Sequence, residues 1–173
     1  MYIYPLLNKR IVMITIEKLL LLKSVNLFKQ MPDDLLLQVA NTLTHQRILS
    51  PGEMVLEKGK VNSTMYVIVS GSVKVHDEHN RTIKELGPRE IFGELSALTE
   101  QPTVSYVSAI SECLLLTIRN DALFDLMSIE LELSKGIIIA LCERTQNMSF
   151  QIQELMHKSE SNLSTLPSSS INK

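Results

Sequence analysis

The spacing of hydrophobic residues changes twice along the chain. Apolar residues recur at helical spacing in residues 15–43, on alternate positions in short runs across residues 46–119, and at helical spacing again in residues 120–157. A period of three to four residues indicates a helix with one apolar face, and a period of two indicates a strand with one face buried. The pattern therefore predicts a β-rich centre with helices before and after it.

Two helices are predicted before the centre. Residues 15–25 mix leucines with Glu17, Lys18 and Lys23 at helical spacing. Pro32 and the two aspartates after it are typical of a first helical turn, and the segment LLLQVANTL carries that second helix to about Leu43.

Short runs rich in Val, Ile, Tyr and Thr fill the centre, and turn residues separate them. The runs are RILS, MVLEK, MYVIVS, SVKVHD, TIKELG, TVSYVSAI and CLLLTI. Pro51-Gly52, Gly59, Gly71 and Gly87-Pro88 mark turns between them. Seven or eight strands of this length favour an antiparallel sandwich or roll. The stretch FGELSALTEQ interrupts the alternation and predicts one short helix within the roll.

The chain after the roll is predicted to hold two helices and a tail. Asn120 and Asp121 precede the helical segment ALFDLMS, and a long helix is expected from about Ile129 to His157. The remaining segment SESNLSTLPSSSINK is rich in serine, which predicts a disordered tail. The expected organisation is an N-terminal extension over 1–13, one domain over 14–158, mainly β with flanking helices, and the tail over 159–173.

Composition narrows the classes of function. The 173 residues are 45% hydrophobic and 21% charged, with a formal net charge of −2, so the chain is globular and lacks the basic field of a nucleic-acid-binding protein. Charged residues interrupt the N-terminal apolar runs well before the roughly 20 residues that a membrane span needs. Cys113 and Cys142 lie in apolar runs without metal-ligand spacing, which predicts core thiols in a reducing cytoplasm. We expect a cytoplasmic protein with no nucleic-acid or membrane partner.

Five sequence features occur in an order that is typical of a known family. They are TIEKLLLLKSVNLFKQMPDD before the roll, Pro51-Gly52-Glu53 at its first turn, Gly59 followed by YVIVSGSVKV, LGPREIFGELSAL, and the two closing helices. From about Ile14 to His157 the chain resembles the cyclic-nucleotide-binding domain family, the β-roll module of kinase regulatory subunits, ion channels and catabolite-activator-type regulators. The resemblance implies an antiparallel β-roll with a ligand site and a regulatory, non-catalytic role.

Residues 92–109 resemble the family's phosphate-binding cassette. The resemblance implies that Gly93 lets the backbone approach a phosphate, that amides in the turn from Glu94 donate to the phosphate oxygens, and that the Glu94 carboxylate accepts from the ribose 2'-hydroxyl. Pro102 matches the proline that precedes the family's phosphate-binding arginine. The expected ligand-binding residues are Gly93, Glu94, Leu95, Ser96, Thr103 and Val104.

The arginine of the cassette is replaced by Thr103 in this sequence. Removing the charged partner of a desolvated phosphate costs about 3–5 kcal/mol, and a hydroxyl returns only about 1 kcal/mol. Ordinary cAMP or cGMP binding is therefore expected to be weak or absent. Arg81, Lys84 or Arg89 could supply the positive charge of the missing arginine from a neighbouring hairpin, or the ligand could be uncharged at that position. Tyr106 also places a ring where the family usually has a smaller residue.

Two features of the sequence have more than one interpretation. Glu94 either retains the ribose contact or only stabilises the N-terminal end of its short helix, by about 0.3–1 kcal/mol. His76 and His79, in VHDEHN, are either metal ligands or members of a solvated hairpin turn, and the sequence favours the turn.

The last helix carries a heptad stripe. Ile138, Leu141, Thr145, Met148, Ile152 and Leu155 alternate at steps of three and four. The stripe either packs on the domain's own roll or joins a second copy. We favour a homodimer through Ile138, Leu141, Met148, Ile152 and Leu155, because the second half of a helix about 40 Å long lies beyond the reach of one small roll. In catabolite-activator-type relatives this helix forms the dimer, so the resemblance implies the same arrangement.

Three functions compete on this sequence. The first is a regulatory module that senses a cyclic nucleotide or another small ligand, and the second is an interaction module that has kept only the fold. The third is a cupin-type metalloenzyme, for which His45, His76, His79 and His157 do not supply a cluster on adjacent strands. We expect a non-enzyme without a metal or a resident cofactor. Direct transcriptional control is not expected, because only the serine-rich tail stands where those relatives continue into a helix-turn-helix domain.

Overall fold

The first two helices begin and end close to the predicted positions. The computed structural model describes residues 13–43 and 45–164. Helix α1 spans Thr15–Ser24 and helix α2 spans Asp33–Thr42. They pack against each other through Leu22 and Leu36, which are fully buried. All of the predicted N-terminal extension except Met13 lies outside the described residues.

Eight strands form two four-stranded sheets, which confirms the predicted antiparallel roll. One sheet has the order β1-β8-β3-β6 and the other has the order β2-β7-β4-β5, and the paired strands run antiparallel. The sequence had not shown β6, because a strand of two residues is too short to display alternation. The strands are β1 His45–Leu49, β2 Met54–Leu56, β3 Thr64–Ser70, β4 Val73–His76, β5 Thr82–Leu86, β6 Ile91–Phe92, β7 Tyr106–Ala109 and β8 Cys113–Arg119.

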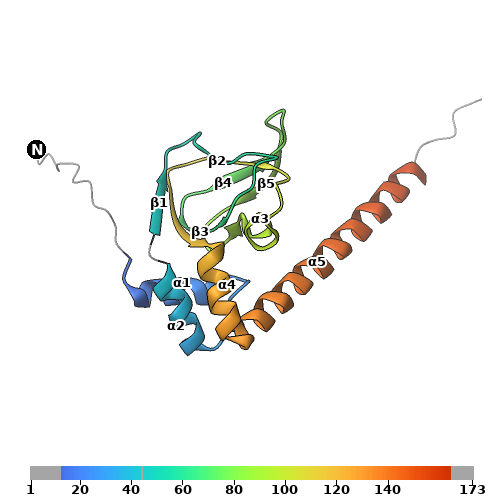
Figure 1. Cartoon of the computed structure of the whole chain (residues 1–173). Helices are drawn as coiled ribbons and strands as arrows, with labels where there is room; N and C mark the ends of the chain where they lie inside the picture. Colours follow the sequence, from blue (N-terminus) through green and yellow to red (C-terminus); the bar gives the residue numbers. More distant parts are fainter. Residues whose placement is uncertain (1–12, 44, 165–173) are drawn as a thin grey trace, which may run out of the picture.

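Strands β3 and β8 are buried on both faces, which explains why their sequences are apolar almost without interruption. Ile68 and Leu115 point into the roll, where they join one hydrophobic cluster. Met65 and Leu116 point the other way, into a second cluster formed with the helices. The two strands therefore fix the helices beneath the roll, as Figure 1 shows.

Helix α3, Glu94–Thr99, is the predicted helical insert and lies between β6 and β7. Helix α4 spans Asn120–Ile129 and helix α5 spans Leu131–Ser164. The first turns of α5 belong to the domain, since Leu133 and Ile137 are buried. Beyond them α5 projects away from the roll (Figure 1).

Helix α5 is longer than predicted. It continues through Ser164, beyond the predicted end of the helix at about His157. The division into a domain over 14–158 and a tail over 159–173 stays a prediction. Between residues 137 and 164 the sequence contains no glycine or proline, so nothing there ends the helix, in spite of the serines. The rest of the predicted tail, 165–173, lies outside the described residues. Within the described part of the chain, no helix is long and apolar enough to cross a bilayer.

Candidate functional site

Gly93 fixes the start of helix α3. It has φ 78° and ψ 0°, in the left-handed region, as the N-cap of α3. A Cβ at this position would lie 2.8 Å from the carbonyl oxygen of Thr64 and 2.9 Å from Nδ2 of Asn62. The Asn62 amide donates hydrogen bonds to the carbonyl oxygens of both Gly93 and Thr64. Both the backbone conformation and the close approach to β3 require glycine here.

Glu94 is buried and paired with a distant arginine. Only 3% of the residue is exposed, and its Oε1 accepts a hydrogen bond from Nη1 of Arg144, a half-exposed residue of α5. A carboxylate removed from water needs a charged or hydrogen-bonding partner. Glu94 also lies in the first turn of α3, but stabilising a helix end would not require burial. The ion pair with Arg144 therefore accounts for the burial of the Glu94 carboxylate, which a role at the helix end alone does not explain.

The hydroxyl of Ser96 joins helix α3 to the residue that follows its C-cap and to the loop before β3. Its Oγ donates to the carbonyl oxygen of Gln101 at 2.6 Å and accepts from the backbone N–H of Asn62 at 2.9 Å. Leu95 is 51% exposed. Gly93, Glu94 and Ser96 are thus brought together at the start of α3, whereas the side chain of Leu95 faces solvent.

Thr103 is tied to the loop between β2 and β3. Its Oγ1 donates to the carbonyl oxygen of Glu57 at 2.5 Å. Its backbone N–H donates to the Lys60 carbonyl at 2.9 Å, and its own carbonyl accepts from the Gly59 N–H at 2.8 Å. Thr103 lines a cavity of about 300 Å³ together with residues 54–57 and 60–62. Val104 is 75% exposed and does not line this cavity.

Two of the three cations that could replace the missing arginine, Arg81 and Lys84, form ion pairs with nearby carboxylates. The Arg81 guanidinium pairs with Asp77 at 2.7 Å, and Lys84 pairs with Glu90 at 3.2 Å. Hydrogen bonds from the backbone N–H and the guanidinium of Arg81 hold the pKa of Asp77 below its usual value. Arg89 lies in the turn after β5 with φ 74°.

The cations beside the cassette are Lys60 and Arg144, and sequence reasoning missed both. Lys60 lines the cavity at Thr103 and pairs with Glu57 at 2.6 Å. An isolated bridge between Val61 and Pro102 brings its loop to the cassette. Gly59 marked that loop in the sequence, but no local signal could connect Arg144 to a residue fifty positions earlier.

Tyr106 and His76 lie on the outside of the roll. Their rings stack with centroids 5.4 Å apart and an interplanar angle of 16°, while the neighbouring Val107 points inward. Tyr106 therefore does not obstruct the interior. His76 is only 6% exposed and is hydrogen-bonded, so the prediction that it lies in a solvated turn is wrong. The same prediction is correct for His79, which is exposed in the turn. Among the described residues, no group of three His, Cys, Asp or Glu could hold a metal ion.

The heptad stripe on α5 changes character along the helix. Leu141 packs against the helical core cluster, so the first half is partly used by the domain itself. The second half is exposed, with Met148 at 54%, Ile152 at 55% and Leu155 at 66%. Ile138 is also 58% exposed. The domain therefore leaves the second half of the stripe, on the projecting part of α5, uncovered.

Comparison with known proteins gives a consistent result. Residues 46–130 match the family model of the cyclic nucleotide-binding domain. The rice potassium channel AKT2 is 32% identical over 120 residues, which are 67% of this chain and 14% of the channel. A CRP-like cAMP-activated global transcriptional regulator from Mycobacterium tuberculosis is 27% identical over 109 residues, which are 61% of this chain and 49% of the regulator. The chain thus spans about half or less of the length of these relatives.

Two solved structures share the fold. The N-terminal domain of a transcriptional regulator from Streptomyces coelicolor A3(2) superposes with a TM-score of 0.63 at 23% identity, covering 76% of this chain and 93% of that one. The Thermus thermophilus catabolite activator protein gives a TM-score of 0.63 at 22% identity, covering 76% of this chain and 63% of that one.

Proposed function

Because this chain belongs to the cyclic-nucleotide-binding domain family, we propose that it is a non-catalytic regulatory module that senses a small ligand at the cassette. The left-handed conformation of Gly93 and the buried Glu94 carboxylate support this proposal, since the cassette pattern gives these two residues the contacts with a ligand phosphate and a ligand hydroxyl. Cys113 is buried as predicted, whereas Cys142 is exposed on α5, so the prediction of a core thiol is wrong for Cys142. Both cysteines are free, which supports a cytoplasmic location.

The ligand-binding residues proposed are Gly93, Glu94, Leu95, Ser96, Thr103 and Val104. Gly93 and the backbone amides after it approach an anionic group, and Glu94 accepts from a ligand hydroxyl. Thr103 carries no charge, and its hydroxyl already donates to the Glu57 carbonyl. A cyclic phosphate would therefore meet no cation supplied by the cassette itself, so cAMP and cGMP bind weakly or a ligand uncharged at that position binds instead.

The ion pair between Glu94 and Arg144 is the observation that carries this proposal. It joins the centre of the cassette to helix α5. A ligand hydroxyl that takes the Glu94 carboxylate competes with Arg144 for it, and an anionic group on the same ligand attracts Arg144. Binding at the cassette therefore changes the contacts of α5, which is the element that projects from the domain (Figure 1).

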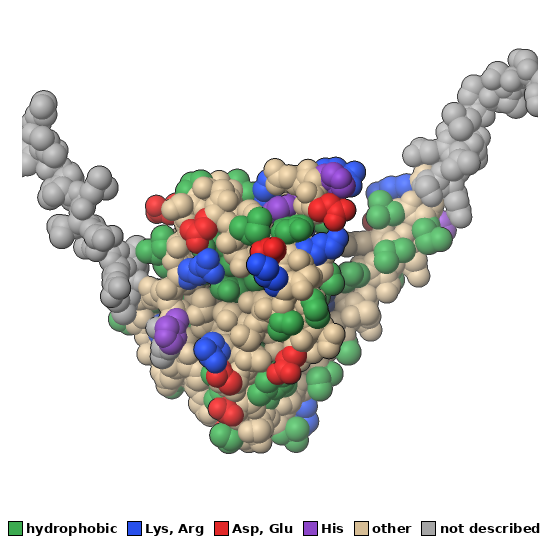
Figure 2. All heavy atoms as spheres, turned by 45° about the horizontal axis from the view of Figure 1, so that its top comes forward, with side chains coloured by type: hydrophobic (Ala, Val, Ile, Leu, Met, Phe, Trp, Pro, Cys, Tyr) green, Lys and Arg blue, Asp and Glu red, His purple; other side chains and the backbone are tan. Residues whose placement is uncertain are grey.

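A second copy of this chain is the proposed partner of α5. The stripe of Ile138, Leu141, Met148, Ile152 and Leu155 has heptad spacing, and its second half is exposed. On the face seen in Figure 2, basic, acidic and hydrophobic side chains are interspersed over the roll. That face therefore offers no broad basic surface for nucleic acid.

The competing function is an interaction module that binds no ligand. One observation favours it: the site is satisfied without a ligand, since Arg144 neutralises Glu94 and the Glu57 carbonyl accepts from Thr103. In that case the ion pair between Glu94 and Arg144 holds α5 against the cassette at all times, and no ligand breaks it.

Amide hydrogen exchange with and without saturating cAMP separates the two functions. Ligand sensing predicts altered exchange both in residues 93–104 and in α5 around Arg144. In the Arg144→Gln variant the change in α5 should be lost, while the change in the cassette remains. Unchanged exchange everywhere, at millimolar cAMP and millimolar cGMP, would exclude both nucleotides as ligands of the wild type. Unchanged exchange in Thr103→Arg under the same conditions would favour the ligand-free module.

Charges on the stripe test the dimer separately. Met148→Glu with Ile152→Glu buries two carboxylates per chain in the proposed seam, which costs several kcal/mol. We expect sedimentation equilibrium to show a dimer for the wild type and a folded monomer for this variant. Gln146→Glu with Gln153→Glu adds the same charges on another face of α5 and should stay dimeric. A monomeric wild type at tens of micromolar would refute the dimer, and an unfolded double variant would assign the stripe to the domain's own core.

A further inference from the structure

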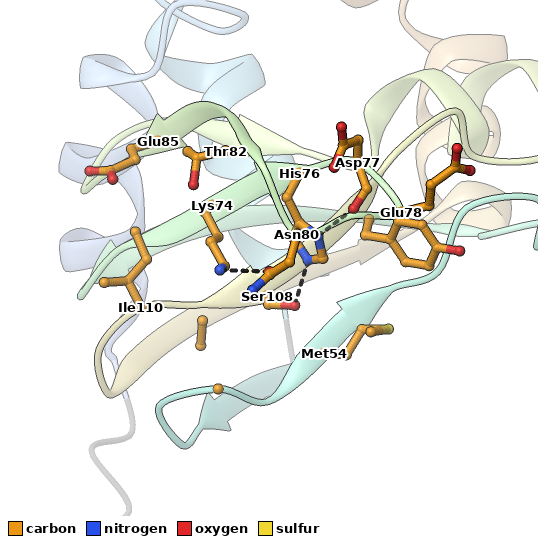
Figure 3. A pocket seen from close by; sticks show the side chains of 13 residues that line it. Met54, Lys74, His76, Asp77, Glu78, Asn80, Thr82, Glu85, Ser108 and Ile110 are labelled. Atoms are coloured by element: carbon orange, nitrogen blue, oxygen red, sulfur yellow. Dashed lines mark hydrogen bonds between the residues drawn. The ribbon is translucent and has the colours of Figure 1, made fainter.

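A second cavity lies outside the roll, on the outer face of the β2-β7-β4-β5 sheet. Its volume is about 810 Å³, which is in the usual range for small-molecule sites, roughly 300–1,000 Å³. Side chains of β4, β5, β7 and the β4–β5 hairpin line it (Figure 3). None of the six proposed cassette residues contributes to it, and it shares only Met54 with the cavity at Thr103.

The floor of this outer cavity is polar and already ordered. His76 and Ser108 are 6% and 7% exposed, and His76 Nε2 lies 2.9 Å from Ser108 Oγ. His76 Nδ1 lies 3.0 Å from the backbone carbonyl oxygen of Asp77, and the Tyr106 ring stacks on the imidazole. Polar side chains on the outer face of such a sheet are commonly solvated. Here the contacts with the hairpin and with Tyr106 shield His76 and Ser108 from water, and they hold the imidazole and phenol rings in place.

The hairpin above the floor is itself braced. The Asp77 carboxylate accepts from the backbone N–H groups of His79 and Arg81 and from the Arg81 guanidinium. Asn80 has φ 62°, and its Oδ1 accepts from Nζ of Lys74 at 2.7 Å. The cavity wall is therefore preorganised, which reduces the entropy lost when a ligand binds.

Lys74 and Glu85 are the two charges of the outer cavity that other ions do not compensate. Asp77 is paired with Arg81, and Glu78 with Lys58. Among the described residues, neither Lys74 nor Glu85 takes part in an ion pair with another side chain. They are directly opposite in the β4–β5 ladder, and the pair Val73–Leu86 beside them points inward, so both face outward. The cavity thus offers one ammonium and one carboxylate at neighbouring positions.

Apolar side chains complete the cavity. Met54 and Ile110 are 48% and 41% exposed, and they lie across the cavity from Thr82 and Glu85 in Figure 3. Tyr106 lines the same space. A ligand that fits must therefore carry apolar surface in addition to its charges.

We propose that this outer cavity binds a small zwitterion with an apolar side chain, of the class of the free apolar amino acids. The ligand carboxylate lies at Lys74, its ammonium lies at Glu85, and its side chain extends over Ser108 toward Met54, which is opposite Ser108 in the β2–β7 ladder. A purely anionic or purely cationic ligand would match one of the two charges and would be repelled by the other. The site is separate from the cassette, so it does not depend on the function proposed there.

Titration of the ¹⁵N-labelled full chain with L-phenylalanine tests this site by NMR. We expect saturable shifts of amides in β4, β5 and β7. The analogues 3-phenylpropanoate, which lacks the ammonium, and phenethylamine, which lacks the carboxylate, should each bind at least about fivefold more weakly, because each loses one charge-assisted hydrogen bond. No shift at about 10 mM phenylalanine would overturn the site, since a weaker site has no useful occupancy.

Single substitutions assign the two charges. Lys74→Met should weaken phenylalanine binding at least about fivefold, and Glu85→Gln should weaken it similarly without weakening 3-phenylpropanoate. Lys84→Gln is the matched control, since Lys84 is the neighbour of Glu85 on β5, pairs with Glu90 and does not line the cavity. The Lys84→Gln variant should bind phenylalanine with the affinity of the wild type. Equal affinity for all three compounds, or equal effects of the Lys74 and Lys84 substitutions, would refute the zwitterion. Thr103→Arg should change nothing here, which separates this result from any failure of the cassette.

Discussion

Both ends of the cassette are held by contacts with the loop before β3 and with β3 itself, but only the first end contributes a charged side chain. At the first end, Gly93 lies against β3 and the buried Glu94 is paired with Arg144. At the other end, Thr103 makes three hydrogen bonds to residues 57–60 and offers no cation. The comparison shows that the shape of a binding loop and its charge are separate properties of a sequence. The fold needs the shape, and only the ligand needs the charge.

One loop explains why the shape survives at both ends. Asn62 contacts Gly93 and Ser96, while Glu57, Gly59 and Lys60 contact Thr103. Two of the three contacts at Thr103 join backbone groups on both sides, which any residue provides. Loss of the arginine therefore leaves the geometry of the cassette intact.

The largest expected effect on stability is at the first end. Gly93→Ala places a Cβ at a left-handed φ and 2.8 Å from the Thr64 carbonyl oxygen, which should lower the free energy of unfolding by about 2–3 kcal/mol. Gly87→Ala is the control, because no atom lies within 4 Å of its Cβ position and it should change the free energy little. Urea denaturation measures both. Equal effects of the two substitutions would mean that the start of α3 is not fixed as described.

Removing Arg144 should have a somewhat smaller effect. Arg144→Gln leaves the Glu94 carboxylate buried without its charged partner, and we expect a loss of about 1–3 kcal/mol, because half of the arginine side chain is exposed. Adding Glu94→Gln should recover most of the loss, since the buried charge is then gone. A double-mutant cycle by urea denaturation measures the coupling. Strictly additive effects would show that the ion pair does not join the cassette to α5.

The smallest effect is expected at the uncharged end. Thr103→Val removes the hydrogen bond to the Glu57 carbonyl but keeps the backbone contacts, so the loss should be about 0.5–1.5 kcal/mol. Its effect on stability should therefore be smaller than that of Gly93→Ala. If instead Thr103→Val unfolds the protein, the second end depends on the side chain far more than its contacts indicate.

The sequence predicted most of the fold because its signals are local. The strand runs, Pro32 before α2, Asn120 at α4 and the insert at Gly93 each showed a pattern within a few residues. Strand β6 was missed because Ile91–Phe92 is too short to alternate. The end of α5 was predicted too early because serines were given more weight than the absence of helix breakers.

The site was predicted only where its chemistry is local. Gly93 and Glu94 were identified from the cassette pattern, and the missing charge at Thr103 was visible at once. The partner of Glu94 was not, because Arg144 reaches the cassette only through the packing of α5. The burial of His76 was missed for the same reason, since it depends on pairing between β4 and β7.

Calorimetric titration of cAMP and cGMP into the wild type and Thr103→Arg tests the central claim most directly. The account predicts wild-type dissociation constants in the micromolar to millimolar range, or no measurable binding. For Thr103→Arg it predicts an affinity at least about tenfold higher, because the arginine restores a bidentate charge-assisted contact with the phosphate. Tight wild-type binding that the substitution does not improve would contradict it, and would show that Lys60 or Arg144 already supplies the missing charge.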